Sequence, residues 1–187
     1  MPRYLVSGIA ELVSAVAAVM REHDAEVVTV DDIADVPGAC SAAGPDAFDG
    51  YVQLPATFTV EGDTAVARVH HFFGEGVLAR FPAVEAALPS LKPGARLTFV
   101  TGVLPGDLST EDDVAARAAL VRILGQAAQA DAANGLRVCT LSSGATPKEI
   151  ALTALGRNPD TRSFATASDE SYAEWRMELL GVMWAET

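Results

Sequence analysis

The segment over 97–144 constrains the fold more than any other part of the chain. It begins with a β-rich apolar run over 97–102, continues with a long alanine- and leucine-rich segment, and ends with a second β-branched run over 135–144. A strand, a helix and a strand in this order predict a right-handed crossover, whose strands lie parallel and are buried on both faces. Ser109 and Thr110 are each followed three residues later by an aspartate, which predicts the start of the helix.

The amino-terminal part of the chain predicts a second unit of the same kind. Residues 4–8 predict a short strand that ends in glycine, and residues 10–23 carry apolar side chains at helical spacing. Residues 26–30 predict the next strand, which is followed by an acidic pair that begins with Asp31. Asp31 therefore stands 23 residues after the glycine that ends the first strand.

The middle of the chain is harder to assign from pattern alone. Residues 35–48 are rich in proline, glycine and alanine and predict a loop with no more than a helical turn, whereas residues 49–54 predict a strand. For residues 57–71 two interpretations stay open, a β-hairpin or the start of a helix. We favour a helix from about residue 64 to 88, broken or kinked near its glycines and Pro82.

The carboxyl-terminal part of the chain predicts two further helices. One spans 147–155, and the other extends from Ser168 to about Ala185. The second helix has one apolar face, made of Tyr172, Trp175, Leu179, Val182 and Met183.

Five strands with helices between them predict an α/β fold of three layers, with a mostly parallel sheet between two layers of helices. A length of 187 residues suits one domain with a sizeable core. We therefore predict a single domain over 1–187, with a core over 1–146 and a helical extension over 147–187.

The composition narrows the expected partners and compartment. The formal net charge is −12 and the pI is near 4.5, so phosphate backbones and anionic lipid repel the protein, and we expect neither nucleic acid nor a membrane as partner. No apolar run approaches the length of a membrane span, and the first residues do not resemble a signal peptide. Cys40 and Cys139 stand far apart, which indicates no disulfide framework and no metal site and favours the cytoplasm.

Four stretches of the chain together resemble the short-chain dehydrogenase/reductase family. The resemblance covers about 4–146 and rests on order and spacing. The stretches are LVSG with the following helix and the strand that ends at Asp31, FDGYVQLPA, ALPSLKPGARLTFVTG, and ARAALVRILGQAAQADAANGLRVCTLSSG. The resemblance implies a Rossmann domain that binds a nicotinamide cofactor. The connection from Asp31 to Asp49 is 18 residues, too short for the family's usual third strand and its helices. The resemblance therefore implies a trimmed sheet with the strand order 2-1-3-4-5.

The family's cofactor motif is only partly present. The family binds NAD(P) through a turn with the sequence G-x-x-x-G-x-G. When Gly8 is aligned with the first glycine of this motif, Leu12 and Ser14 stand at the positions of the other two glycines. Those glycines let the backbone approach the pyrophosphate at the start of the helix. Asp31 matches the acid that holds the adenine ribose, although an acid that ends a strand is also commonly a solvated turn. Gly8 and Asp31 are the remaining candidate cofactor-binding residues, and we expect no ordinary NAD(P) binding.

The family's catalytic residues are also replaced. Where the family has Y-x-x-x-K, this chain has Asp113 and Arg117, a pair that also suits a simple ion pair at a helix start. Thr101 lies near the position of the family's serine, and His71 takes the place of its asparagine. Ser143 begins the Ser-Gly that replaces the family's Pro-Gly. If His71 faces the crevice at the strand ends together with Thr101, Asp113 and Ser143, these residues form an acid/base set; alternatively the histidine is a packed residue in an inert helix.

Three functions therefore stay open. In the first, the chain is a degenerate dehydrogenase-like protein that binds a small molecule or serves as a silent subunit. In the second, it is a non-redox biosynthetic enzyme of isomerase, dehydratase or cyclase type. In the third, it is an atypical NAD(P)-dependent oxidoreductase. The family assembles through the helices equivalent to 64–88 and 112–130, so we expect a homodimer or a hetero-oligomer with a relative. In an open α/β sheet, any ligand is expected at the carboxyl ends of the strands.

Overall fold

A computed structural model describes residues 1–56, 59–132 and 135–158. Its sheet has five parallel strands in the order β2-β1-β3-β4-β5, which confirms the predicted α/β class and strand order. The strands are β1 (Arg3–Ser7), β2 (Glu26–Val30), β3 (Phe48–Gln53), β4 (Leu91–Val100) and β5 (Arg137–Leu141).

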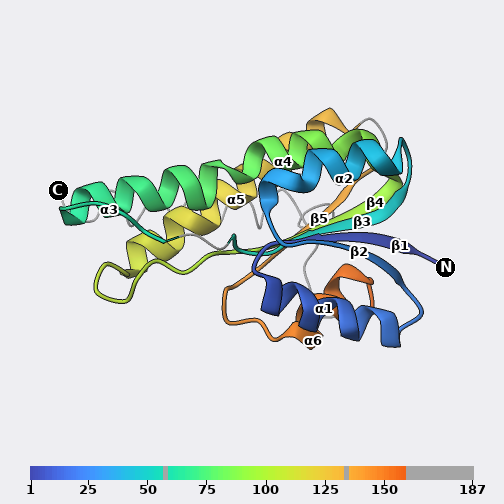
Figure 1. Ribbon diagram of the computed structural model, residues 1–187, viewed down its shortest axis with the longest axis horizontal. Coiled ribbons are helices and arrows are strands. Elements are labelled where there is room, and N and C mark those ends of the chain that lie inside the picture. The colour runs from blue at the N-terminus through green and yellow to red at the C-terminus, as the bar shows by residue number, and fades with distance from the viewer. Residues whose placement is uncertain (57–58, 133–134, 159–187) are drawn as a thin grey trace, which may run out of the picture.

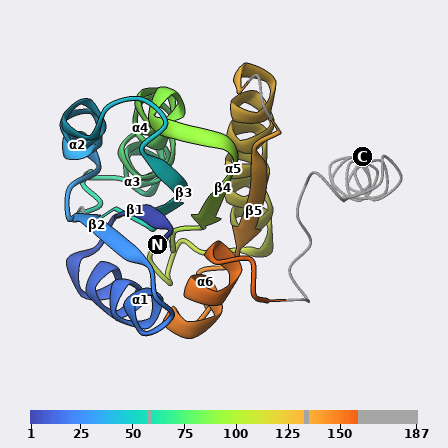
Figure 2. The same ribbon diagram turned by 90° about the vertical axis from the view of Figure 1, so that its right-hand side faces the viewer.

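Helices cover both faces of this sheet, as Figures 1 and 2 show. The chain forms α1 (Ala10–Glu22), α2 (Val36–Ala43), α3 (Ala65–His71), the π-helix η2 (Phe72–Leu78), α4 (Arg80–Ala87), α5 (Glu111–Asp131) and α6 (Pro147–Ala154), with short 3₁₀ turns η1 (Ile33–Asp35) and η3 (Leu88–Ser90). Side chains of α1 and α6 pack on one face, and those of α2, α4 and α5 on the other. The three predicted layers are present.

The segment expected to be a loop over 35–48 contains the helix α2, so that expectation was wrong. Pro37 lies in the first turn of α2, where its missing N–H costs no hydrogen bond. Gly44 ends the helix with φ of 85°. Val36 and Cys40 are buried against the sheet. Val36 and Cys40 are four residues apart and therefore lie on one face of α2, which packs on the sheet. The proline and glycine content of the segment favoured a loop and did not indicate this face.

The interrupted helix before β4 is confirmed, and with it the helical interpretation of the preceding segment. Thr64 caps α3 by accepting a hydrogen bond from the Ala67 N–H at 3.1 Å. The helix continues through the π-helix η2, which contains Gly74 and Gly76, into α4. Figure 1 shows α3 extending well beyond the end of the sheet.

A small third cluster of apolar side chains fills the space under this projecting helix. Its buried members are Phe72, Val77 and Leu104. Leu104 comes from the loop over 101–110 that joins β4 to α5, so this loop is anchored by its own apolar side chain.

β4 begins at Leu91, six residues earlier than expected. Lys92, Pro93 and Gly94 disfavour a strand by sequence, so the start of β4 was not predicted. The predicted helix over 168–185 lies outside the described residues. Within the described parts of the chain, no helix is long and apolar enough to cross a membrane.

Candidate functional site

The carboxyl edge of the sheet contains the point where the chain reverses direction between β1 and β3. α1 leaves β1 toward one face, and the chain after β3 leads to helices on the other face, so a crevice is expected here. The loop that follows β1 and the loop that follows β3 instead contact each other directly. The Leu54 N–H donates to the Ser7 carbonyl at 2.8 Å, and the Ile9 N–H donates to the Pro55 carbonyl at 2.9 Å.

Gly8 is required by this close approach. Its φ is 133°, and a Cβ added there would lie 2.7 Å from both the Leu54 Cβ and the Pro55 carbonyl oxygen. The glycine that we predicted as a cofactor-binding residue therefore accommodates the loop after β3. Leu12, in the first turn of α1, packs against the core on the α1 face.

Asp31, the other candidate cofactor-binding residue, is exposed at the end of β2. It lines an open hollow of about 620 Å³ together with Asp32, Asp35, Gly38 and Ala39. Among the described residues, no group of three histidine, cysteine or acidic side chains gathers closely enough to hold a metal ion.

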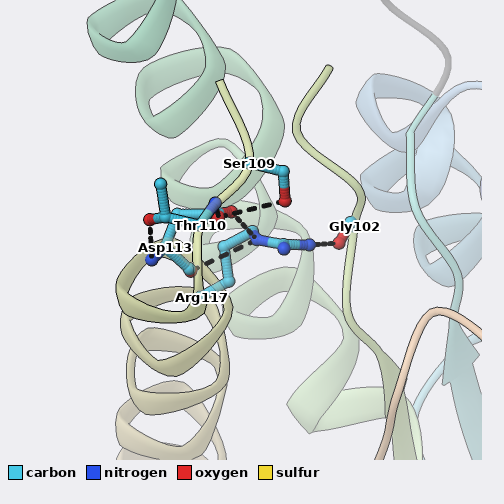
Figure 3. Close-up of polar contacts among 5 residues, drawn as sticks. All are labelled: Gly102, Ser109, Thr110, Asp113 and Arg117. Atoms are coloured by element: carbon cyan, nitrogen blue, oxygen red, sulfur yellow. Dashed lines mark hydrogen bonds and ion pairs between the residues drawn. The ribbon is translucent and has the colours of Figure 1, made fainter. Parts of the chain in front are cut away.

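Asp113 and Arg117 form a buried ion pair at the start of α5, shown in Figure 3. The Arg117 Nε lies 2.8 Å from the Asp113 Oδ2, and their side chains are only 5% and 9% exposed. The Arg117 Nε–H is directed at the main-chain carbonyl of Asp113, 3.3 Å away, so the contact with Oδ2 is between charges and is not a hydrogen bond. The Arg117 guanidinium also lies over the Phe72 ring, 5.9 Å from its centroid.

This ion pair holds both ends of the loop over 102–110. Arg117 Nη1 donates to the carbonyl of Gly102 at the beginning of the loop. At its end, the Asp113 Oδ1 accepts from the Ser109 hydroxyl at 3.1 Å and from the Thr110 N–H at 2.5 Å (Figure 3). Thr110 in turn accepts from the Asp113 N–H, completing a capping box. We call this arrangement the Asp113–Arg117 latch.

Of the other candidate residues, Thr101 and Ser143 lie at the same edge, whereas His71 lies at the end of α3. Thr101 is buried directly after β4, and its N–H donates to the Leu141 carbonyl at 3.0 Å, while Ser143 is exposed just after β5. His71 ends α3, is half-buried, and accepts a hydrogen bond at Nδ1 from the Glu61 N–H at 3.1 Å. The strand ends thus bring Thr101 close to the latch through its neighbour Gly102.

A buried polar network at the same edge was not predicted. Arg80, 1% exposed, donates from Nε to the Gln53 Oε1 at 2.9 Å and from Nη2 to the Gln53 carbonyl at 2.8 Å. The Gln53 amide donates to the Arg80 carbonyl at 3.1 Å and to the Tyr51 hydroxyl at 3.2 Å, and Tyr51 bonds the Ser7 hydroxyl at 2.8 Å. The available signal was a single arginine within an otherwise mostly apolar helical run.

Burial shifts both titrating groups of this network toward their neutral forms. Desolvation, opposed by the charge interaction with Tyr51, lowers the pKa of Arg80 to about 10. Desolvation also raises the pKa of Tyr51 to about 12, although its hydrogen bonds to Ser7 and Gln53 act in the other direction. At neutral pH the network holds a charged guanidinium beside a neutral phenol, with no carboxylate paired to Arg80 in the described chain.

Comparison with known proteins identifies the fold. No protein-family model matches the chain, and no curated protein matches it. Three solved structures are similar to it. A protein assigned as a short-chain alcohol dehydrogenase from Burkholderia multivorans has a TM-score of 0.59 and 14% identity over 83% of this chain and 89% of its own. A small-chain dehydrogenase has a TM-score of 0.58 and 20% identity over 85% and 90%.

The third is BdcA (YjgI) from E. coli, with a TM-score of 0.52 and 14% identity over 85% of this chain and 90% of its own. These likenesses confirm the resemblance in fold to short-chain dehydrogenases.

Proposed function

We propose that this chain is a dehydrogenase-like Rossmann protein that does not perform ordinary hydride transfer and acts as a small-molecule-binding or silent partner protein. The observation that supports it best is the Asp113–Arg117 latch. Both residues that stand in place of the family's tyrosine and lysine are buried and engaged within the protein.

Hydride transfer to a carbonyl requires a nearby group that gives up a proton. A guanidinium stays protonated at any physiological pH, so Arg117 is a poor proton donor. Asp113 is engaged with Ser109, Thr110 and Arg117. Neither side chain has the freedom of a tyrosine hydroxyl that faces a substrate.

The loop contact at Gly8 supports a second part of the proposal, the absence of ordinary NAD(P) binding. A pyrophosphate needs close access to the backbone at the start of α1. Here the Ile9 N–H already donates to Pro55, and Leu12 replaces a glycine of the turn. The residues present therefore fit the cofactor poorly.

A nicotinamide fluorescence titration of the full chain with NADH and NADPH tests this proposal. We expect no saturation at micromolar concentrations. A micromolar dissociation constant corresponds to about 8 kcal/mol of binding and would refute the proposal. A redox activity with alcohol or carbonyl substrates, lost on changing Arg117→Met, would support the oxidoreductase alternative instead.

One observation favours the second candidate, a non-redox enzyme. His71 accepts a hydrogen bond at Nδ1 from the Glu61 N–H, and it adjoins a π-helix, a feature frequent at functional sites. In this alternative His71 would exchange a proton with the substrate beside Thr101 and Ser143. Loss of an isomerase or dehydratase activity in His71→Gln, with retention in the exposed neighbour variant His70→Gln, would establish it.

We further propose that the protein is cytoplasmic and assembles as a homodimer or with a dehydrogenase-like relative. Exposed apolar side chains on the helices that the family uses for assembly support this proposal; they are Val66, Leu78, Val114 and Ile123. A light-scattering mass near 19.5 kDa at high concentration would exclude the homodimer.

A further inference from the structure

The strand β2 forms one edge of the sheet, visible in Figure 2 at the side away from β5. Among the described residues it pairs with β1 alone, because the chain between β2 and β3 contains α2 and no further strand. Edge strands expose a row of main-chain donors and acceptors to any segment that can pair with them. Natural proteins usually protect such an edge.

The register shows which groups of β2 face outward. The Glu26 N–H donates to the Pro2 carbonyl at 2.9 Å, and the Val30 carbonyl accepts from the Gly8 N–H at 3.2 Å. In a parallel ladder alternate residues bond to the same neighbour, so Val27 and Thr29 direct their N–H and C=O groups to the open side.

Within the part of the chain that the structure describes, only the amino-terminal half of this open side has a hydrogen-bond partner. Arg21, at the end of α1, donates from Nη2 to the Val27 carbonyl at 3.2 Å. Thr29 is exposed, and among the described residues no partner bonds its outward N–H or carbonyl. The carboxyl half of β2 is therefore the half open to pairing.

The charge beside this open half selects the partner. Asp31, Asp32 and Asp35 follow β2, are exposed, and line the hollow of about 620 Å³, and none of them forms an ion pair with another described residue. Antiparallel pairing of two copies about Val28 would place Asp32 opposite Asp24 of the other copy. Such like-charge pairs oppose pairing, so the edge disfavours self-association.

We infer that the open edge of β2 binds an extended, basic segment of another protein by strand addition. The main chain of the segment pairs with Thr29, and a lysine or arginine side chain occupies the hollow lined by Asp31 and Asp35. Arg21 moves aside when pairing extends to Val27. This binding surface is independent of the proposed function.

A blocked six-residue peptide of alternating valine and lysine is a suitable probe, titrated by calorimetry against the full chain, with a valine–glutamate peptide as control. Thr29→Pro removes the outward N–H, a change that edge strands tolerate, whereas Thr29→Val keeps it. We expect the lysine peptide to bind the parent and Thr29→Val alike, and Thr29→Pro at least tenfold more weakly. Arg21→Ala should tighten binding.

Charge variants separate this site from general attraction to an acidic protein. Asp31→Asn combined with Asp35→Asn should weaken binding several-fold, while Asp131→Asn, remote at the end of α5, should leave it unchanged. Equal binding to Thr29→Pro and Thr29→Val would overturn the inference, provided that urea midpoints show both variants folded. The inference is also overturned if Asp131→Asn loses as much affinity for the lysine peptide as the Asp31→Asn, Asp35→Asn double variant. Equal affinity for the glutamate and lysine peptides would overturn it too, as would the absence of lysine-peptide binding to both the parent and Arg21→Ala.

Discussion

The Arg80–Gln53 network leads to a stability prediction in which the two partners behave differently. Arg80→Met removes a buried charge, and Gln53→Leu leaves that charge in place without its amide acceptor. Both substitutions roughly preserve side-chain volume, so cavity effects are small. The difference between them isolates the consequence of burying the guanidinium.

The magnitude follows from the burial and the hydrogen bonds. Burial lowers the pKa of Arg80 from its ordinary value to about 10, which corresponds to a cost of about 3 kcal/mol for the charged form. Arg80→Met removes this cost but leaves the two Gln53 oxygens without their donor, at about 1–3 kcal/mol each. The two effects nearly cancel, and we expect a net loss of about 1 kcal/mol.

Gln53→Leu has no compensating gain. It removes the Oε1 acceptor and the amide donor to Tyr51 while the guanidinium stays buried. Leaving a buried donor without its acceptor costs about 1–3 kcal/mol, and more when the donor is charged, so we expect a loss of about 3 kcal/mol. The double variant Arg80→Met with Gln53→Leu should recover most of that loss, because both polar groups are then absent.

Urea unfolding of the full chain, followed by circular dichroism, measures these differences through the midpoint at constant slope. Arg137→Met, at an exposed arginine of β5, is the matched control and should change stability by less than about 0.5 kcal/mol. The reasoning is refuted if Arg80→Met is as destabilising as Gln53→Leu, or if the double variant is no more stable than Gln53→Leu.

Three further predictions concern other contacts. Asp113→Asn should cost about 3 kcal/mol and speed hydrogen exchange over 102–110, measured by mass spectrometry; unchanged exchange there would contradict the latch. Gly125→Ala should destabilise by about 1 kcal/mol in urea, because its Cβ would lie 2.6 Å from a β5 side chain, which outweighs the better helix propensity. Burial raises the pKa of Asp49, but hydrogen bonds from Lys92 and the Arg3 N–H outweigh it and lower the pKa. The stability this adds is present above the unfolded pKa and lost as pH falls through the folded one, so Lys92→Ala should flatten the acid side of a stability–pH curve.

The elements that were predictable from sequence carry their signal locally. The helix α5 begins where Thr110 and Asp113 form a capping box, a pattern visible within four residues. The parallel pairing followed from apolar runs separated by helices, since parallel strands need such crossovers, whereas the strand order followed from the family resemblance. α2 was missed because Pro37 and Gly38 predict a loop in isolation, and a buried face overrides that preference.

The site residues were only partly predictable because their partners are remote in sequence. The spacing of Asp113 and Arg117 indicates an ion pair on one helix face, which the structure contains. Nothing in that spacing indicates that Arg117 reaches Gly102, fifteen residues earlier. Arg80 and Gln53 are 27 residues apart, so their pairing depends on how α4 lies over β3.

The three contacts at the carboxyl edge share a physical consequence. In open α/β proteins the loops at this edge hold polar groups available to a ligand. Here the Ile9 N–H is engaged by Pro55 and the Gly102 carbonyl by Arg117. Gln53 is likewise engaged by Arg80. Polar groups that bond within the protein stabilise the fold and are not available to a ligand. This agrees with the general observation that stability is often gained at the cost of activity. Substitutions that free these groups should therefore lower stability first, and any gain in ligand binding should appear only in variants that remain folded.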